Sequence, residues 1–292
     1  FKEEKDLIQS DLDAIVISSP NFTHVPLALA ALKTGKHIFL EKPVGITPSE
    51  CRKLLRATKR SDRVLMIGHE LRYSPYFAKI KHLIDRGAVG TPRMVWCKEF
   101  RGPFQPKSRD WIQDRRKSGG CLVDKNCHHF DLMNWWVGAR PKRVAAFGGN
   151  AVNRVIEGPN QVHDHVAVSW EYENTVRGTL HLCLFAHEPP RETLEMGVVG
   201  DQGVLQTDLD NLQILHWQHG KRKGEPRVIK VKAKRGVGWG GHLGFAEMHP
   251  AFIKAIRRGK TPLTSVANTI DGTLLAIAAE ESIRTRKIIT IR

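Results

Sequence analysis

The chain has 292 residues, of which 41% are hydrophobic and 26% are charged, a balance that excludes a disordered or fibrous protein. At about 150 residues per domain, the length predicts two domains. Lysine and arginine number 46 against 30 acidic residues, which gives a formal charge of +16. Apolar runs such as 27–32 and 274–279 are far shorter than the roughly 20 residues that span a bilayer, and no secretion signal opens the sequence, so we expect a cytoplasmic protein without a membrane partner.

The first hundred residues alternate between strand and helix patterns. Short apolar runs bounded by turn residues predict strands at 14–18, 38–40 and 64–67. Asn21 or Thr23 can cap a first helix that Gly35 ends. The sequence Thr47-Pro48-Ser49-Glu50 is a capping box with proline at the first helical position, and it predicts a second helix to about residue 60.

This order of strands and helices predicts a parallel sheet with right-handed crossovers. Ligands bind such sheets outside the carboxyl ends of the strands. Polar clusters follow the three strands at 18–24, 41–42 and 69–72. We therefore expect a small-molecule site at this edge of the sheet.

A dinucleotide-binding fold opens with a strand, a glycine-rich turn and a helix that receives the pyrophosphate. The pattern GxGxxG does not occur in this sequence, which starts at Phe1. We expect residues 1–72 to form the second half of a doubly wound, Rossmann-type domain, with about 60 residues of the first half missing in front. The residue that separates NAD from NADP would lie in that half, so the choice between them stays open.

Residues 73–292 predict an α+β domain with an open-faced, mainly antiparallel sheet. A helix is expected from 74 to 87, a strand at 93–100, a polar loop at 101–118, and a helix from Gly120 to about Gly138. Mainly β patterns follow from 144 to 217, and helices at 246–258 and 266–285 close the chain.

The densest run of positive charge lies at 221–235. Apolar residues at 229, 231 and 233 alternate there with lysines at 230, 232 and 234, which is typical of a strand with one face in water. No helix-turn-helix, zinc-finger spacing or aromatic stacking platform accompanies this run, so we expect no nucleic-acid partner. This basic face could instead attract an anionic cofactor or substrate.

The metal-binding residue types give no strong site. The cysteines at 51, 97, 121, 127 and 183 are odd in number and form no CxxC, which indicates reduced thiols and not a disulfide frame or a structural zinc site. Neighbouring helical residues such as His128 and His129 point apart. The pair His163 and His165 lacks a third ligand at a telling distance, so we expect no metal.

Lys42 is the first candidate for chemistry. The following Pro43 favours an extended backbone, so the side chain should project from the strand end, beside Glu41. A lysine that is partly desolvated in a cleft has a lowered pKa and can protonate or bind a substrate oxygen. The alternative is a surface lysine before a loop proline.

Asp124, His128 and Asp131 stand at positions i, i+4 and i+7 of one predicted helix, so they should share a face. A carboxylate at Asp124 could orient the His128 imidazole as a proton-handling pair. The alternative is a carboxylate that favours the helix dipole, with a buried histidine below it.

Three stretches of the sequence resemble the Gfo/Idh/MocA oxidoreductase family. The first stretch is Ser19-Pro20-Asn21-x-x-His24, followed by Lys33-x-Gly35-Lys36-His37 and Glu41-Lys42-Pro43. The second is Gly119-Gly120-x-x-x-Asp124-x-x-x-His128-x-x-Asp131. The third is 241–282, with Gly241-His242 and Ala279-Glu280-Glu281-Ser282. The resemblance runs in order over nearly the whole chain. One departure is Asn126, where many relatives carry glycine, which would alter the shape of the pocket.

The resemblance implies an NAD(P)-dependent oxidoreductase that acts on a sugar or cyclitol and forms a homo-oligomer through its sheet domain. It implies catalytic roles for Lys42, Asp124 and His128, which would also contact the substrate together with His242. Positions that match the cofactor site are Ser18, Ser19, Pro20, Asn21, His24, Glu41, Lys42, Arg72 and Trp111. Whether Lys42 or His128 acts as the base stays open at this point.

Two other functions remain. One is a glycoside hydrolase of the same superfamily that uses NAD transiently, against which the Asp124-x-x-x-His128 pattern argues. The other is a non-catalytic sugar-sensing or interaction protein, which the absent GxGxxG favours and the intact Lys42, Asp124 and His128 set opposes.

Overall fold

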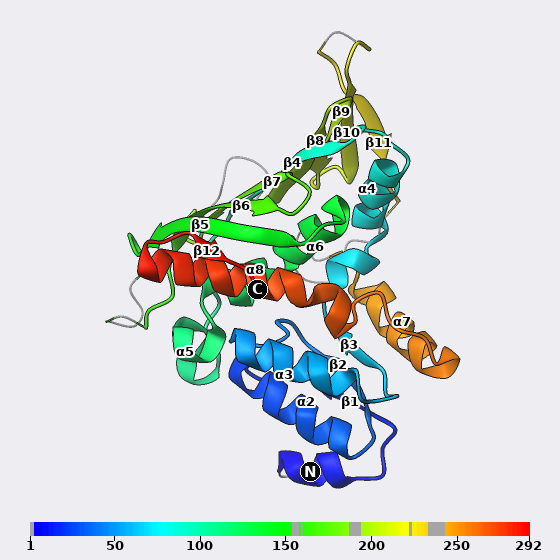
Figure 1. Ribbon diagram of the computed structural model, residues 1–292, viewed down its shortest axis with the longest axis vertical. Helices are drawn as coiled ribbons and strands as arrows, with labels where there is room; N and C mark the ends of the chain where they lie inside the picture. The colour runs from blue at the N-terminus through cyan, green and yellow to red at the C-terminus, as the bar shows by residue number, and fades with distance from the viewer. Residues whose placement is uncertain (1–2, 154–157, 159, 187–193, 222–223, 233–242) are drawn as a thin grey trace.

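Two sheets organise the chain (Figure 1), and the computed structural model describes residues 3–153, 158, 160–186, 194–221, 224–232 and 243–292. A parallel sheet has the strand order β1-β2-β3. A larger, mixed sheet has the order β11-β10-β9-β8-β4-β7-β6-β5-β12. Together they confirm the predicted combination of a Rossmann-type parallel sheet with a mainly antiparallel sheet and helices.

The small sheet has its three strands and two crossover helices in the predicted order, whereas the first helix, α1 (Glu4–Gln9), was not predicted. The elements that follow it are β1 (Ala14–Ile17), η1 (Asn21–Thr23), α2 (His24–Lys33), β2 (His37–Leu40), α3 (Pro48–Thr58) and β3 (Leu65–Ile67). Strands β1, β2 and β3 pair in parallel, so their carboxyl ends lie at one edge. Their buried side chains, such as Ile15, Ile38 and Leu65, form one core with α2 and α3.

The predicted capping box at the beginning of α3 is present. Thr47 Oγ1 accepts a hydrogen bond of 3.2 Å from the Glu50 backbone N–H, and Glu50 Oε2 accepts one of 3.1 Å from the Thr47 N–H. The same Glu50 oxygen accepts a 3.0 Å bond from the Ile46 N–H. These bonds fix the end of the loop that carries Lys42, because they tie residues 46 and 47 to the first turn of the helix.

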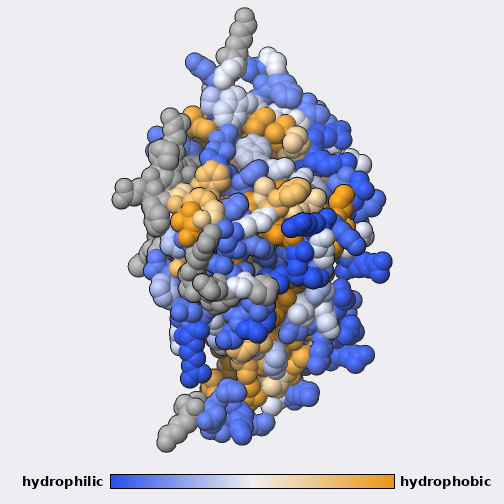
Figure 2. Space-filling view, turned by 90° about the vertical axis from the view of Figure 1, so that its left-hand side faces the viewer, coloured by the Kyte–Doolittle hydropathy of each residue, from blue (hydrophilic) through white to orange (hydrophobic). Residues whose placement is uncertain are grey.

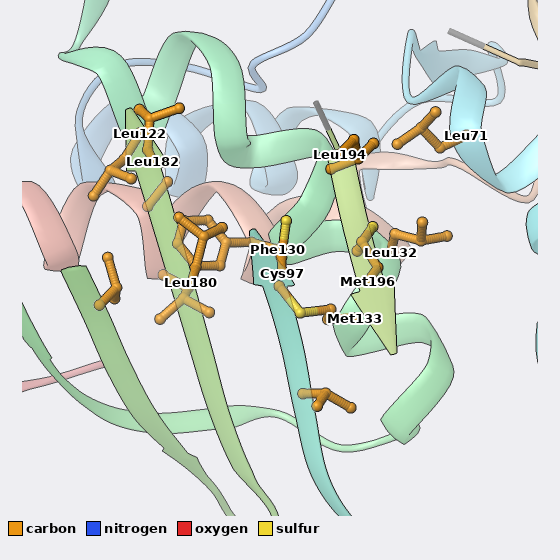
Figure 3. Packing of buried hydrophobic residues seen from close by; sticks show 14 of the residues in the cluster. Leu71, Cys97, Leu122, Phe130, Leu132, Met133, Leu180, Leu182, Leu194 and Met196 are labelled. Carbon is orange, nitrogen blue, oxygen red and sulfur yellow. The ribbon is translucent and has the colours of Figure 1, made fainter. Parts of the chain in front are cut away.

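The large sheet is built from β4 (Pro92–Phe100), β5 (Pro141–Gly149), β6 (His165–Tyr172), β7 (Arg177–Cys183), β8 (Leu194–Gly200), β9 (Gly203–Asp208), β10 (Gln213–Gln218), β11 (Arg227–Lys230) and β12 (Ile289–Thr290). Strand β4 pairs in parallel with β7 and antiparallel with β8. One sheet face packs against helices that include α4 (Pro75–Asp85), α6 (Cys127–Val137) and α8 (Val266–Thr285), and Figure 1 shows α6 and α8 below the sheet. Figure 3 shows Phe130, Leu132 and Met133 of α6 packing against Cys97 of β4 and Met196 of β8.

Helix α8 joins the two cores. Its residues Val266, Ile270 and Leu274 belong to the core of the small sheet, whereas Leu275 and Ala279 belong to the core of the large one. A helix that is apolar on several sides is buried on several sides. The large sheet and the small sheet are therefore held on opposite sides of α8, while α7 (Phe245–Arg258) packs beside β2 and β3.

The structure differs from the sequence-based prediction in several segments. The predicted polar loop at 101–118 contains the short helices η3 (Ser108–Gln113) and α5 (Arg115–Ser118), because Asp114 caps α5 with a 3.0 Å bond from the Arg116 N–H. The helix after Gly120 begins as the π-helical turn η4 (Leu122–Asn126) before it continues as α6. The basic strand β11 is shorter than the predicted run, since it ends at Lys230, and residues 222–223 and 233–235 of that run lie outside the described residues.

The surface agrees with the composition. Hydrophilic residues cover most of the face shown in Figure 2, with hydrophobic side chains visible in patches between them. Of the helices in the described part of the chain, none combines the length and the apolar character that crossing a bilayer requires.

Candidate active site

The three polar clusters that follow β1, β2 and β3 meet at one edge of the small sheet, as parallel pairing requires. The turn η4 and helix α6 reach the same edge. Asn21 Nδ2, after β1, donates a 3.0 Å bond to Asp124 Oδ1, and Lys42 Nζ, after β2, donates a 2.6 Å bond to the Asp124 carbonyl oxygen. Glu70, after β3, contacts His128. The structure thus brings Lys42, Asp124 and His128 to one edge, although Lys42 and His128 are 86 positions apart in the sequence.

Lys42 projects from the end of β2 toward η4. Its Nζ lies 3.9 Å from Asp124 Oδ1, and its side chain keeps 20% of its surface exposed. Burial alone would lower the pKa of Lys42, but the negative groups around it, Asp124 first, outweigh that effect and raise the pKa. The sequence-based expectation of a lowered pKa is therefore wrong, and Lys42 is a cation at neutral pH.

The helix that carries Asp124 and His128 is not regular, contrary to the sequence-based expectation. The turn η4 is π-helical, so its hydrogen bonds join residues i and i+5. The side chain of Asp124 contacts Lys42 and Asn21. The carboxylate at the ring of His128 is instead that of Glu70, which corrects the expected pairing of Asp124 with His128.

His128 is buried among polar side chains. Its Nδ1 is 3.0 Å from Glu70 Oε2, and its ring meets the His69 ring edge to face with 5.5 Å between centroids. Burial lowers the pKa of His128 well below its usual value, the Glu70 carboxylate opposes this shift, and Lys42 and His69 add to it. His128 is therefore neutral at neutral pH.

Glu70 was not assigned to the site from the sequence, although the cluster 69–72 was. It begins the short helix η2 (Glu70–Tyr73), and its side chain is 1% exposed. The available signal was an acidic residue three positions after the end of a strand, at the edge where ligands bind such sheets.

Arg72 and Asp131 form a buried ion pair. Arg72 donates bonds of 2.7 Å from Nε to Asp131 Oδ2 and of 2.7 Å from Nη2 to Oδ1, and Nη2 also donates to the Asn268 carbonyl at 2.9 Å. These bonds join η2, α6 and α8 behind the site. Trp111, in η3, packs half-buried against the core of the large sheet. His242 lies outside the described residues.

The remaining predicted residues form the rim of the site. Ser18 is exposed, and Ser19, Pro20 and Glu41 are half-buried. The His24 ring lies between the carbonyl oxygens of Ser19 and Pro43, 2.9 Å from each, and so ties the segment after β1 to the segment after β2.

Glu41 is the titratable group of this rim. Burial raises the pKa of Glu41 to about 7, Lys42 opposes the shift, and Glu70 adds to it. A Cβ at residue 68 would lie 2.8 Å from Glu41 Oε2, so a side chain there would displace this carboxyl group from its place against Gly68.

These residues fit the nicotinamide end of a dinucleotide. Neither ring nitrogen of the buried His69 has a hydrogen-bond partner within the described residues, so this edge has unused capacity to bind polar groups. The Lys42 ammonium is partly exposed along the same edge, and Ser18 is exposed there too, so both can donate to a bound group.

The metal-binding residue types are dispersed by the fold. His128 faces Glu70, whereas Nδ1 of the adjacent His129 lies 3.6 Å from Glu99. Across the described ranges, no three His, Cys, Asp or Glu side chains come together closely enough to hold a metal ion.

Comparison with known proteins gives two family matches. The NAD-binding Rossmann fold of the oxidoreductase family matches residues 1–69, and the GFO/IDH/MocA C-terminal domain matches residues 77–206.

Individual relatives agree with these matches. Myo-inositol 2-dehydrogenase of Thermotoga maritima is 25% identical over 294 residues, which cover 100% of this chain and 84% of that protein. The uncharacterized oxidoreductase YrbE of Bacillus subtilis is 35% identical over 150 residues, which are 51% of this chain and 42% of YrbE. The structure of levoglucosan dehydrogenase in complex with NADH superposes with a TM-score of 0.85 at 22% identity, over 100% of this chain and 83% of that one. This likeness shows that the fold is shared.

Proposed function

The chain belongs to the Gfo/Idh/MocA family of oxidoreductases, and we propose that it transfers a hydride between NAD(P) and a secondary alcohol, or the matching ketone, of a sugar or cyclitol. The observation that carries this proposal is the meeting of a cationic Lys42 and a neutral His128 at the carboxyl edge of the small sheet. The names of relatives that act on inositol and levoglucosan support the substrate class.

The two groups divide the proton chemistry between them. Their surroundings move the two pKa values in opposite directions, which is the usual sign of an acid and a base with separate roles. We assign His128 as the base, because its neutral imidazole can take the hydroxyl proton. We assign Lys42 to the substrate oxygen, because a fixed positive charge stabilises the negative charge that develops there.

Asp124 holds the cation in place. The Asp124 carbonyl oxygen accepts a hydrogen bond from the Lys42 ammonium, and the Asp124 carboxylate lies beside that ammonium. The lysine side chain is therefore held in position before substrate binds. Asn21 fixes that carboxylate with a 3.0 Å bond and bonds to the Ser118 carbonyl at 2.9 Å. A substrate hydroxyl next to the reacting carbon can donate a hydrogen bond to the other carboxylate oxygen of Asp124.

We assign the nicotinamide and its ribose to Ser18, Ser19, Pro20 and Glu41, with Lys42 shared between cofactor and substrate. A bound nicotinamide supplies the hydride acceptor. Asn21 and His24 shape this edge through their bonds to Ser118, Ser19 and Pro43. Arg72, Trp111 and His242 stay predictions, as does the boundary near residue 72 between the cofactor and substrate domains.

We also propose that a second copy of the chain covers the open face of the large sheet. Phe147 of β5 is 80% exposed, Met94 of β4 is 49% exposed and Phe100 of β4 is 37% exposed. Large apolar side chains in this number on one sheet face are typical of an interaction surface.

The test is a steady-state assay of NAD and NADP reduction with a panel of cyclitols and sugars, preceded by titration with NADH. We expect saturable NADH binding and turnover of at least one polyol. Lys42→Met should lower kcat by about 10²-fold or more, whereas the control Lys59→Met, at an exposed lysine after α3, should not. Turnover by the Lys42 variant within twofold of the wild type would refute the assignment. Release of sugar from an aryl glycoside without net NADH would instead indicate a hydrolase.

A further inference from the structure

Glu70 is a buried acidic residue for which the proposed function gives no role. Its Oε2 lies 3.0 Å from Nδ1 of His128, and the two side chains are 1% and 5% exposed. A carboxylate removed from water to this degree requires a hydrogen-bond donor or a positive charge beside it. An ionised Glu70 requires a hydrogen atom on the imidazole nitrogen that faces it.

The position of that hydrogen determines which nitrogen can act as a base. A neutral imidazole has one N–H and one nitrogen with a free lone pair. When the hydrogen is on Nδ1, the lone pair is on Nε2. A histidine base requires this arrangement, because its second nitrogen must accept the substrate proton while the first is held by its partner.

The charges around His128 leave Glu70 as the group that favours a protonated ring. The titratable groups that face it are Glu70 at the beginning of η2, Lys42 after β2 and His69 after β3. Lys42 and His69 disfavour a positive charge on the ring, and burial disfavours it further. The Glu70 carboxylate acts in the opposite direction.

We propose that Glu70 is a positioning residue, which keeps the hydrogen of His128 on Nδ1 and stabilises the imidazolium formed when Nε2 takes a proton. The hydroxyl proton moves to Nε2, the hydride leaves the same carbon for the nicotinamide, Nδ1 keeps its own hydrogen and Glu70 stays ionised. The catalytic part of this inference rests on the proposed function. The location of the hydrogen does not, because it is a property of the protein alone.

The location of the hydrogen can be measured without substrate. In the full chain with ¹⁵N-labelled histidine, the His128 nitrogen signals are assigned by their loss in His128→Gln. We expect a protonated Nδ1 and an unprotonated Nε2 at neutral pH in the wild type, and a change of this pattern in Glu70→Leu. A wild-type His128 with its hydrogen on Nε2, or an unchanged pattern in Glu70→Leu, would overturn the proposal.

Kinetics test the second half of the inference. Glu70→Gln keeps the size of the side chain and removes its charge, so kcat should fall by about 10²-fold or more, while NADH affinity stays unchanged. The acid limb of the pH profile of kcat/KM should move to lower pH, because removal of the carboxylate lowers the pKa of His128 further. A merely structural role would lower activity without moving this limb.

The fold provides a matched control. Asp164 Oδ1 lies 2.8 Å from Nδ1 of His165, so Asp164→Asn removes the charge from another carboxylate–imidazole pair. We expect it to leave the His128 signals and the pH limb unchanged. If Glu70→Gln behaves like this control, the proposal is wrong. If no polyol in the panel is turned over by the wild type, the proposed function fails, whereas the nitrogen signals still decide where Glu70 holds the hydrogen.

Discussion

Ionisation of Glu41 should lower the free energy of unfolding as the pH rises from acidic to mildly alkaline. Burial raises the pKa of this carboxyl group from its usual 4.5 to about 7, although Lys42 opposes the shift. The folded state therefore holds a proton that the unfolded chain has released over this range. Because the folded state binds more protons, the free energy of unfolding decreases as pH rises from about 4.5 to about 7.

The size of the effect follows from the two pKa values. At about 1.4 kcal/mol per pKa unit, the rise from 4.5 to about 7 corresponds to about 3 kcal/mol in total. This stabilisation is complete below the lower pKa and lost above the higher one. Most of it, about 2 to 3 kcal/mol, should disappear between about pH 5 and about pH 8. Glu41→Gln cannot ionise, so it should not show this loss.

Urea unfolding of the wild type and Glu41→Gln at about pH 5 and about pH 8 measures the effect as a change in midpoint at constant slope. The wild type should lose about 2 to 3 kcal/mol more than the variant over this span. Glu173→Gln, at an exposed carboxylate in the turn between β6 and β7, is the control and should follow the wild type. Parallel pH dependences of the wild type and Glu41→Gln would refute the reasoning, because Glu41 would then ionise at an ordinary pH.

Two further predictions concern the buried ion pair behind the site and the open face of the large sheet. Asp131→Asn leaves the Arg72 guanidinium buried without its ion partner and should destabilise the protein by about 3 to 5 kcal/mol in urea unfolding; a loss below about 1 kcal/mol would show that the pair is not the link we describe. Phe147→Glu places a charge on the open sheet face and should lower the molar mass measured by light scattering, whereas Val152→Glu, at a 59% exposed site beyond β5, should not. An unchanged mass for the Phe147 variant would exclude this face as the contact between copies.

Local patterns in the sequence predicted most of the fold, because they depend on neighbours along the chain. The capping box at Thr47 and Glu50 fixes the beginning of α3 through bonds within four residues. Helix α8 was predicted at 266–285, and the structure has it there. Lys42, Asp124 and His128 could be selected because they follow strand ends or a glycine pair, and the structure brings all three to one edge.

The sequence could not reveal features that depend on contacts between distant segments. A π-helical turn has no clear pattern of residues, and the Lys42 ammonium that bonds to the Asp124 carbonyl in η4 comes from 82 positions away. The short helices in the predicted loop 101–118 were missed because this segment has few apolar residues at helical spacing. The direction of the Lys42 pKa shift was misjudged because burial was foreseeable, whereas the Asp124 carboxylate that opposes its effect comes from a distant segment.

The charge states of Lys42 and His128 are therefore consequences of the fold. Both side chains are largely removed from water, and burial by itself would neutralise each of them. What separates them is which groups each one faces. Lys42 lies among Asp124, Glu41 and Glu70, whereas His128 faces Glu70 on one side and the cation on another. A fixed cation and a neutral base at one edge are what removal of a proton and a hydride from one alcohol requires, and this division depends on acids supplied after β2, after β3 and within η4.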